Sequence, residues 1–207
     1  MPLNGVQIDS IGVIYLKMHP RVKMAARIKF PIKPKKIVET MLYLAHKDIE
    51  LSQYKTVKLL YLADLEHFRR FGRPISFDKY VAMRNGPVAS IALDIIKGKT
   101  VEGINRDDLP FEIRKFDDLY IIEKPKRGIK QEGFSKSDLI VLDEICKKYG
   151  RAGFMELYNE THKHFAYTRA RNNQKTEADP MFFEDFLNET ADKEDKVQDL
   201  EFTALSM

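Results

Sequence analysis

The distribution of apolar residues predicts a long helix at the centre of the fold, over about Gln53–Phe71. Apolar side chains in this segment occur on nearly every side of a helix, and the stripe extends into its last turn. These residues are Val57, Leu59, Leu60, Leu62, Leu65, Phe68 and Phe71. Gly72 and Pro74 follow, as is typical of a helix end. A helix that is apolar most of the way round is expected inside a domain and not on its surface.

Shorter elements are predicted on both sides of this helix. The spacing of apolar residues favours a helix from about Pro34 to His46, and alternation favours a strand over Lys79–Arg84. Asn85 and Gly86 are turn residues that would end this strand. Pro87 then fits the first position of a third helix, where its missing N–H has no partner to lose.

The second half of the chain shows a hairpin pattern followed by a helix start. Phe111–Phe116 and Leu119–Glu123 read as two strands joined across a pair of aspartates. Ser135 and Asp138 are spaced as a capping box, in which each side chain bonds a free backbone N–H of the first helical turn. We therefore expect a fourth helix from this point to Gly150.

Two more helices complete the expected fold. One covers about residues 153–163, and a short last helix is expected from Asp179 and Pro180, a capping residue followed by proline. The fold class predicted from these elements is mainly α (α+β). It is a compact helical domain of about five or six helices with a small antiparallel sheet or hairpin.

Composition supports a soluble domain in a reducing compartment. The 207 residues suit one domain with tails, and 43% hydrophobic residues are enough to build a sizeable core. Cys146 is the only cysteine, which excludes an intramolecular disulfide framework. No apolar run approaches the roughly 20 residues that a membrane helix needs. We therefore expect a cytoplasmic protein.

Charge is distributed unevenly between the two ends of the chain. Residues 17–36 contain many lysines and arginines and no acid, whereas residues 177–201 are strongly acidic. We therefore expect a basic extension over residues 1–30 that need not be ordered, a domain over residues 31–176, and a short helix with an acidic tail over residues 177–207. The charged ends are typical of solvated segments, and they could also dock a charged partner.

Candidate catalytic and metal-binding groups are few. Asp64 and His67 are three residues apart, and His162 and His164 are two apart, a spacing that points two helical side chains in nearly opposite directions. We therefore expect no metal and no cofactor, and regard Asp64 or His164 as a polar group held by hydrogen bonds near the core. No nucleophile elbow or phosphate-binding glycine loop occurs in the sequence.

A longer motif resembles a known family. The run KLLYLADLEH-x4-GRPI-x2-DKYVAMRNGPV-x-S, from Lys58 to Ser90, resembles the Panacea domain, also described as the SocA-like antitoxin domain. A second, weaker block runs from Phe134 to Tyr167, where Tyr167 stands near a position at which the family often has Trp. The motif residues, which the resemblance implies are mainly structural, are Lys58, Leu60, Asp64, His67, Gly72, Tyr80, Asn85, Gly86, Pro87 and His164.

The resemblance implies an antitoxin and not an enzyme. Such a protein would neutralise a cognate toxin, which a neighbouring gene can encode, by direct contact or as an adaptor that presents the toxin to a cytoplasmic protease. The variable parts are candidate contact regions: the basic N-terminal segment, the loop Gly98–Leu109 and the acidic tail. The candidate partner-binding residues are Phe182, Phe183, Phe186, Arg69 and Arg73, since aromatic clusters and arginine are common in protein interfaces.

Two other functions are weaker alternatives. A nucleic-acid-associated regulator would use the basic residues near Arg69 and a second basic cluster over residues 124–130, but no recognition helix is evident, which makes nucleic acid an unlikely partner. A metal-binding enzyme would require the scattered histidines and aspartates to converge in a cleft.

Overall fold

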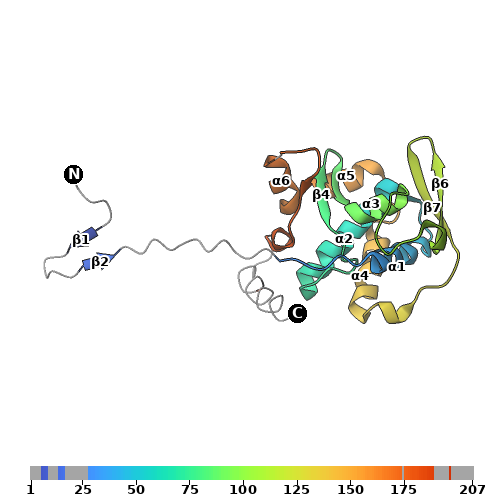
Figure 1. Cartoon of the computed structure of the whole chain (residues 1–207), viewed down its shortest axis with the longest axis horizontal. Coiled ribbons are helices and arrows are strands. Elements are labelled where there is room, and N and C mark those ends of the chain that lie inside the picture. Colours follow the sequence, from blue (N-terminus) through green and yellow to red (C-terminus); the bar gives the residue numbers. More distant parts are fainter. Residues whose placement is uncertain (1–5, 9–13, 17–27, 174, 189–195, 197–207) are drawn as a thin grey trace.

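The computed structural model describes residues 6–8, 14–16, 28–173, 175–188 and 196, and it is mainly helical with small antiparallel sheets (Figure 1). This confirms the predicted fold class. The helices of the described residues are α1 (Pro34–Ala45), α2 (Gln53–Phe71), α3 (Ser90–Ile96), α4 (Lys136–Tyr149), α5 (Phe154–His162), α6 (Phe165–Asn172) and the short 3-10 segments η1 (Arg106–Asp108), η2 (Gln131–Gly133) and η3 (Phe183–Leu187).

Helix α2 is the centre of the fold, as predicted, with the predicted bounds. It contacts α1, α3, α4, α5 and η3 as well as strands of two sheets. Ser52 caps its start by accepting a hydrogen bond from the backbone N–H of Lys55, and Gly72 ends it in a left-handed conformation (φ 72°). Phe71 is 46% exposed, so the apolar stripe ends one turn before the helix does.

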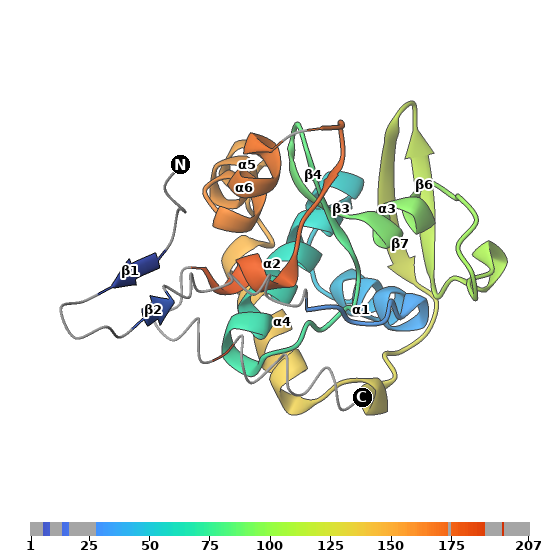
Figure 2. The same ribbon diagram turned by 60° about the vertical axis from the view of Figure 1, so that its left-hand side comes forward.

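The strands form three small antiparallel sheets. Their orders are β1-β2, β3-β7-β6 and β5-β4-β8, and Figure 2 shows the β6–β7 hairpin standing away from α5 and α6. The strands are β1 (Val6–Ile8), β2 (Ile14–Leu16), β3 (Leu51–Ser52), β4 (Tyr80–Met83), β5 (Gly86–Ala89), β6 (Phe111–Phe116), β7 (Leu119–Pro125) and β8 (Asp179–Pro180). The predicted β6–β7 hairpin is confirmed, with Phe116 opposite Leu119 next to its turn.

The prediction that Pro87 begins a helix was wrong. Pro87 lies in β5, opposite Ala82 of β4, and helix α3 begins three residues later at Ser90. Strand β5 is at the edge of its sheet, where a residue without an N–H is tolerated. Gly86, the first residue of this strand, has φ +98°, a conformation that favours glycine.

The predicted helix start at Asp179 and Pro180 was also wrong. These two residues form β8, which pairs with β4, and the helical turn η3 follows later. The Asp179 carboxylate accepts hydrogen bonds from the backbone N–H groups of Lys175 and Thr176, which precede it, and so it closes a turn instead of capping a helix. Helix α6 was not predicted.

One hydrophobic core joins these elements, with buried members from Ile28 to Leu187. The predicted capping box of α4 is present, since Ser135 and Asp138 exchange hydrogen bonds with each other's backbone N–H groups. Most of the basic N-terminal extension and of the acidic tail lies outside the described residues. No helix in the described part of the chain has the length and apolar character to cross a membrane.

Candidate partner-binding surface

Asp64 holds the segment after α2 in place. Its side chain is fully buried, and its carboxylate accepts hydrogen bonds from the backbone N–H groups of Ile75 and Ser76 at 2.8 Å. The hydroxyls of Ser76 and Tyr80 donate to its other oxygen at 2.6 and 2.7 Å. Burial raises the pKa of Asp64, while these hydrogen bonds oppose the rise. The expectation of a hydrogen-bonded polar group near the core is confirmed.

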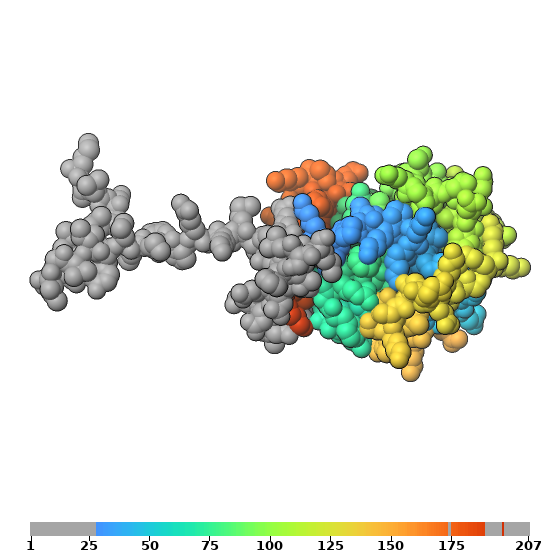
Figure 3. Space-filling view, turned by 60° about the horizontal axis from the view of Figure 1, so that its bottom comes forward, coloured from blue at the N-terminus to red at the C-terminus, as the bar shows by residue number. Residues whose placement is uncertain are grey.

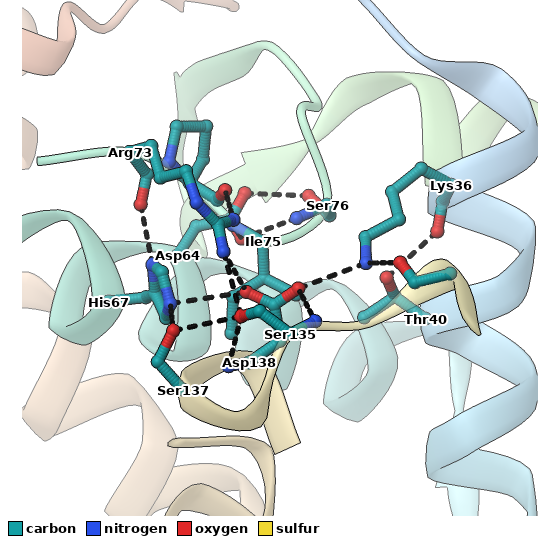
Figure 4. Close-up of polar contacts among 12 residues, drawn as sticks. Lys36, Thr40, Asp64, His67, Arg73, Ile75, Ser76, Ser135, Ser137 and Asp138 are labelled. Carbon is teal, nitrogen blue, oxygen red and sulfur yellow. Dashed lines mark hydrogen bonds and ion pairs between the residues drawn. The ribbon is translucent and has the colours of Figure 1, made fainter. Parts of the chain in front are cut away.

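Asp138 gathers basic side chains from α1, α2 and the loop after α2 (Figure 4). Its carboxylate lies 2.7 Å from Nη2 of Arg73, 3.1 Å from Nε2 of His67 and 3.2 Å from Nζ of Lys36. The Nδ1 atom of His67 donates to the carbonyl of Arg73 at 2.7 Å. Burial tends to raise the pKa of Asp138, but these partners hold it well below its usual range. Arg73 and His67 therefore hold α2 and α4 together.

Asp78 performs a similar task at the base of the β4–β5 hairpin. Its carboxylate accepts from the backbone N–H groups of Ile91 and Ala92, each at 2.9 Å, and so caps the start of α3. Burial raises the pKa of Asp78 to about 7 against the effect of these bonds. The sequence reasoning did not select Asp78, although an aspartate next to a strand and a nearby helix start was a signal for it.

Lys58 of α2 lies beneath the tip of the β4–β5 hairpin, next to Gly86 and Pro87, from which it is distant in the sequence. The Lys58 side chain is 1% exposed, and its Nζ donates to the carbonyl of Pro87 at 2.7 Å. His162 also reaches this hairpin, with Nε2 3.3 Å from the carbonyl of Arg84. Sequence reasoning did not place His162 here, because no local pattern brings α5 to this turn.

The other motif residues have separate positions. His164 precedes α6 and is buried, with its ring 5.6 Å from that of Tyr61, whereas Asn85 is exposed at the hairpin turn and Leu60 is fully buried. Across the described residues, no group of three or more His, Cys, Asp or Glu side chains could hold a metal ion. His162 therefore lies near the tip of the β4–β5 hairpin, beside Gly86.

The C-terminal aromatic residues pack on the core to different extents. Phe186 is 1% exposed and lies edge-on to Tyr61 and Phe68, while Phe182 and Phe183 are half-buried. Arg69, another candidate contact residue, donates from Nε to the carbonyl of Phe186 at 2.8 Å. Thus Phe186 and Arg69 help to fix η3 on α2. The proposed contact with a partner stays a prediction, and Phe182 offers more accessible surface for it than Phe186 does.

A large hollow on the described surface lies beside the start of α1. It has a volume of about 820 Å³, and Figure 3 shows this face, with α1 in blue beside the yellow segment around residues 127–133. The segment 103–110 also lines this hollow, and most of it belongs to the loop that the sequence analysis selected as a candidate contact region. Buried Val38, Leu109 and Pro110 belong to its lining. We call this hollow the α1 groove.

Charged residues from two basic stretches of the sequence face each other across the α1 groove. Lys35 and Lys36 come from the first stretch, and Arg127 and Lys130 come from the second. Arg127 forms a bidentate ion pair with Glu39 at 3.1 and 2.6 Å. This pair joins the segment around Arg127 to α1. The exposed acids Asp108 and Glu132 lie in the same lining, so the groove offers both signs of charge around an apolar floor.

Comparison with protein families identifies a match over the part of the chain that carries the motif. The model of the family described as "Antitoxin SocA-like, Panacea domain" matches residues 57–166, from the start of α2 to the start of α6. No curated protein and no solved structure matches the chain. The match covers more than half of the sequence and includes Lys58, Asp64 and Asp138. The chain belongs to the SocA-like antitoxin family with a Panacea domain.

Proposed function

We propose that this protein is an antitoxin that neutralises a cognate protein toxin by direct contact, and that the α1 groove is part of the contact surface. Membership of the family is the observation that carries this proposal, because an antitoxin family implies a toxin partner and a role in binding. The toxin would be the product of an adjacent gene. Delivery of the bound toxin to a cytoplasmic protease is the second form of the same function.

Two structural features support the groove as the contact region. The buried carboxylates of Asp64, Asp78 and Asp138 bond to groups of their own chain, so a structural role accounts for them. The α1 groove instead combines exposed charges with an apolar lining, in which Ile104 is half-buried. It also involves α1, which lies before the part of the chain that the family model matches. A surface of this kind can differ between relatives and select one toxin.

A rescue experiment tests the proposal. The adjacent open reading frame is induced in a bacterial host, with and without this protein, and cell growth is measured. The groove variant Lys35→Glu/Lys130→Glu reverses two exposed charges that form no ion pair with a described residue. We expect the wild type to restore growth. The number of surviving cells should be at least tenfold lower with the groove variant, because a reversed charge repels the matching toxin residues.

The matched control is Lys79→Glu/Lys147→Glu. Both lysines are exposed and lie outside the groove, and the charge change is the same. Equal thermal stability of both variants would show that a loss of rescue is not a loss of folding. Full rescue by the groove variant would refute the role of the groove in toxin binding. Phe182→Ala would then test whether the C-terminal aromatic residues contact the toxin. No rescue by the wild type would refute the antitoxin function with this toxin.

Toxin abundance distinguishes the two forms of the function. If binding alone neutralises the toxin, its level in rescued cells stays unchanged, and the two purified proteins form a stable complex. If the protein is an adaptor, the toxin level falls in the presence of this protein and recovers in a host that lacks the protease.

A further inference from the structure

Lys58 is a buried amine without a buried acid beside it. Its Nζ donates to the carbonyl of Pro87 and lies 5.0 Å from the centre of the Tyr54 ring. None of the ion pairs found among the described residues includes Lys58. A charged amine that has no opposite charge beside it is more stable in water than in the protein interior.

The tip of the β4–β5 hairpin lies close against this amine. A Cβ atom added at Gly86 would lie 2.8 Å from Nζ of Lys58, 3.0 Å from Cε1 of His162 and 3.0 Å from Oγ1 of Thr161. The backbone of Gly86 therefore fits closely over the amine, between α2 and α5. Lifting the hairpin tip is the movement that would expose Nζ.

Side-chain donors from three helices hold the tip down. Besides Lys58 of α2, the hydroxyl of Tyr167 in α6 donates to the carbonyl of Met83 at 3.0 Å, and His162 of α5 approaches the carbonyl of Arg84. The other ring nitrogen of His162 lies 2.7 Å from the carbonyl of Tyr158. Both ring nitrogens of His162 thus face backbone carbonyls, one in its own helix and one in the hairpin.

The groups around Lys58 add no negative charge at neutral pH. Those that can titrate are Tyr54 on its own helix, Tyr158 and His162 on α5, and Tyr167 on α6. Asp78 lies at the opposite end of the hairpin, next to the start of α3. Burial lowers the pKa of Lys58 to about 7, whereas an exposed lysine has a pKa of about 10.4.

We propose that the β4–β5 hairpin is a lid over Lys58, and that its opening is coupled to the uptake of a proton by the exposed amine. The lid is then tightest at alkaline pH and loosens towards neutral pH. Opening moves the exposed turn residues Arg84 and Asn85 and uncovers a cation beneath them, which gives a binding partner a second conformation to select. This lid does not depend on the proposed antitoxin function.

The direction and size of the effect follow from linkage. Between pH 10 and pH 7 the open form binds more protons than the closed form, so each lower pH unit favours opening by up to about tenfold. With the two pKa values above, opening increases about 50-fold from pH 9 to pH 7 and levels off below pH 7.

Amide hydrogen exchange of the full chain between pH 6 and pH 9 tests the lid. After correction for the intrinsic pH dependence of exchange, we expect the protection of the amides in residues 81–89 to fall about 50-fold from pH 9 to pH 7. Amides in the middle of α4 are the internal reference. Lys58→Met, which cannot titrate, should abolish this dependence, and Lys55→Met, which removes a half-buried lysine one turn earlier, should preserve it.

Two outcomes would overturn the proposal that the hairpin is a lid coupled to protonation of Lys58. One is hairpin protection in the wild type that does not change with pH relative to α4, and the other is a pH dependence that persists in Lys58→Met. If Lys58→Met does not fold, an NMR titration of the Lys58 side chain in the wild type decides. A midpoint near pH 7 supports the proposal that Lys58 is neutral when the hairpin is closed at alkaline pH. A midpoint above about pH 10 refutes the proposal.

Discussion

Replacing Asp138 by alanine should destabilise the protein far more than replacing any exposed aspartate. The carboxylate is 3% exposed and bonds Arg73, His67 and Lys36, of which His67 is fully buried and Lys36 is 14% exposed. Removing it leaves Lys36 and Arg73 without their counter-charge, and the loss of one partner of a buried pair costs about 3–5 kcal/mol. The broken capping bond to the N–H of Ser135 adds about 1 kcal/mol.

Urea and thermal unfolding measure this effect. A loss of about 4–6 kcal/mol corresponds to a fall in Tm of roughly 8–24 °C for a domain of this size. Asp143→Ala is the matched control on the same helix, because Asp143 is 59% exposed and its pair with Lys47 should contribute about 1 kcal/mol or less. Similar losses in the two variants would show that the Asp138 cluster does not hold the fold.

The pH dependence provides a second check on Asp138. The pKa of this carboxyl is lower in the folded protein than in the unfolded chain, so its contribution is complete above about pH 4 and is lost as the pH falls further. The stability difference between the wild type and Asp138→Ala should therefore be constant from pH 7 to pH 5 and should narrow below pH 4. A difference that grows on acidification would contradict the assigned sign.

Three more perturbations have defined outcomes. Phe186→Ala should lower the unfolding free energy by about 3–5 kcal/mol through loss of a fully buried ring, whereas half-buried Phe182→Ala should cost about 1 kcal/mol, both by urea unfolding. Gly86→Ala should lower Tm, because its Cβ would meet Nζ of Lys58 and the backbone has φ +98°; an unchanged Tm would contradict this packing. Burial raises the pKa of Cys146 to about 11, so its thiol should react with a disulfide reagent at pH 8 at least tenfold more slowly in the folded than in the urea-unfolded protein.

Local signals were sufficient for several elements. Helix α2 was predictable because its apolar residues surround it and Gly72 marks its end, and both signals act within a few residues. The capping box of α4 was predictable for the same reason, since Ser135 and Asp138 bond each other's backbone across three residues. The family motif likewise lies in one nearly continuous run of the chain.

The errors occurred where one local signal suits two structures. A proline after Asn85 and Gly86 fits the first turn of a helix and also fits an edge strand, and only pairing with Ala82 made Pro87 part of β5. Asp179 next to a proline resembles a helix cap, but its carboxylate closes the preceding turn and its backbone pairs with β4. A partner about 100 residues away cannot be read from local spacing.

The sequence by itself determined the main helices, the β6–β7 hairpin and the family, because periodicity, capping and a contiguous motif are all short-range properties of the chain. Tertiary structure alone decided the chemistry of the charged residues. It enclosed Lys58 beneath Gly86, brought His162 to the same hairpin, and placed two separate basic stretches along one groove. The physical reason is that burial and neighbouring charge set the state of an ionisable group, and both depend on residues distant in the sequence.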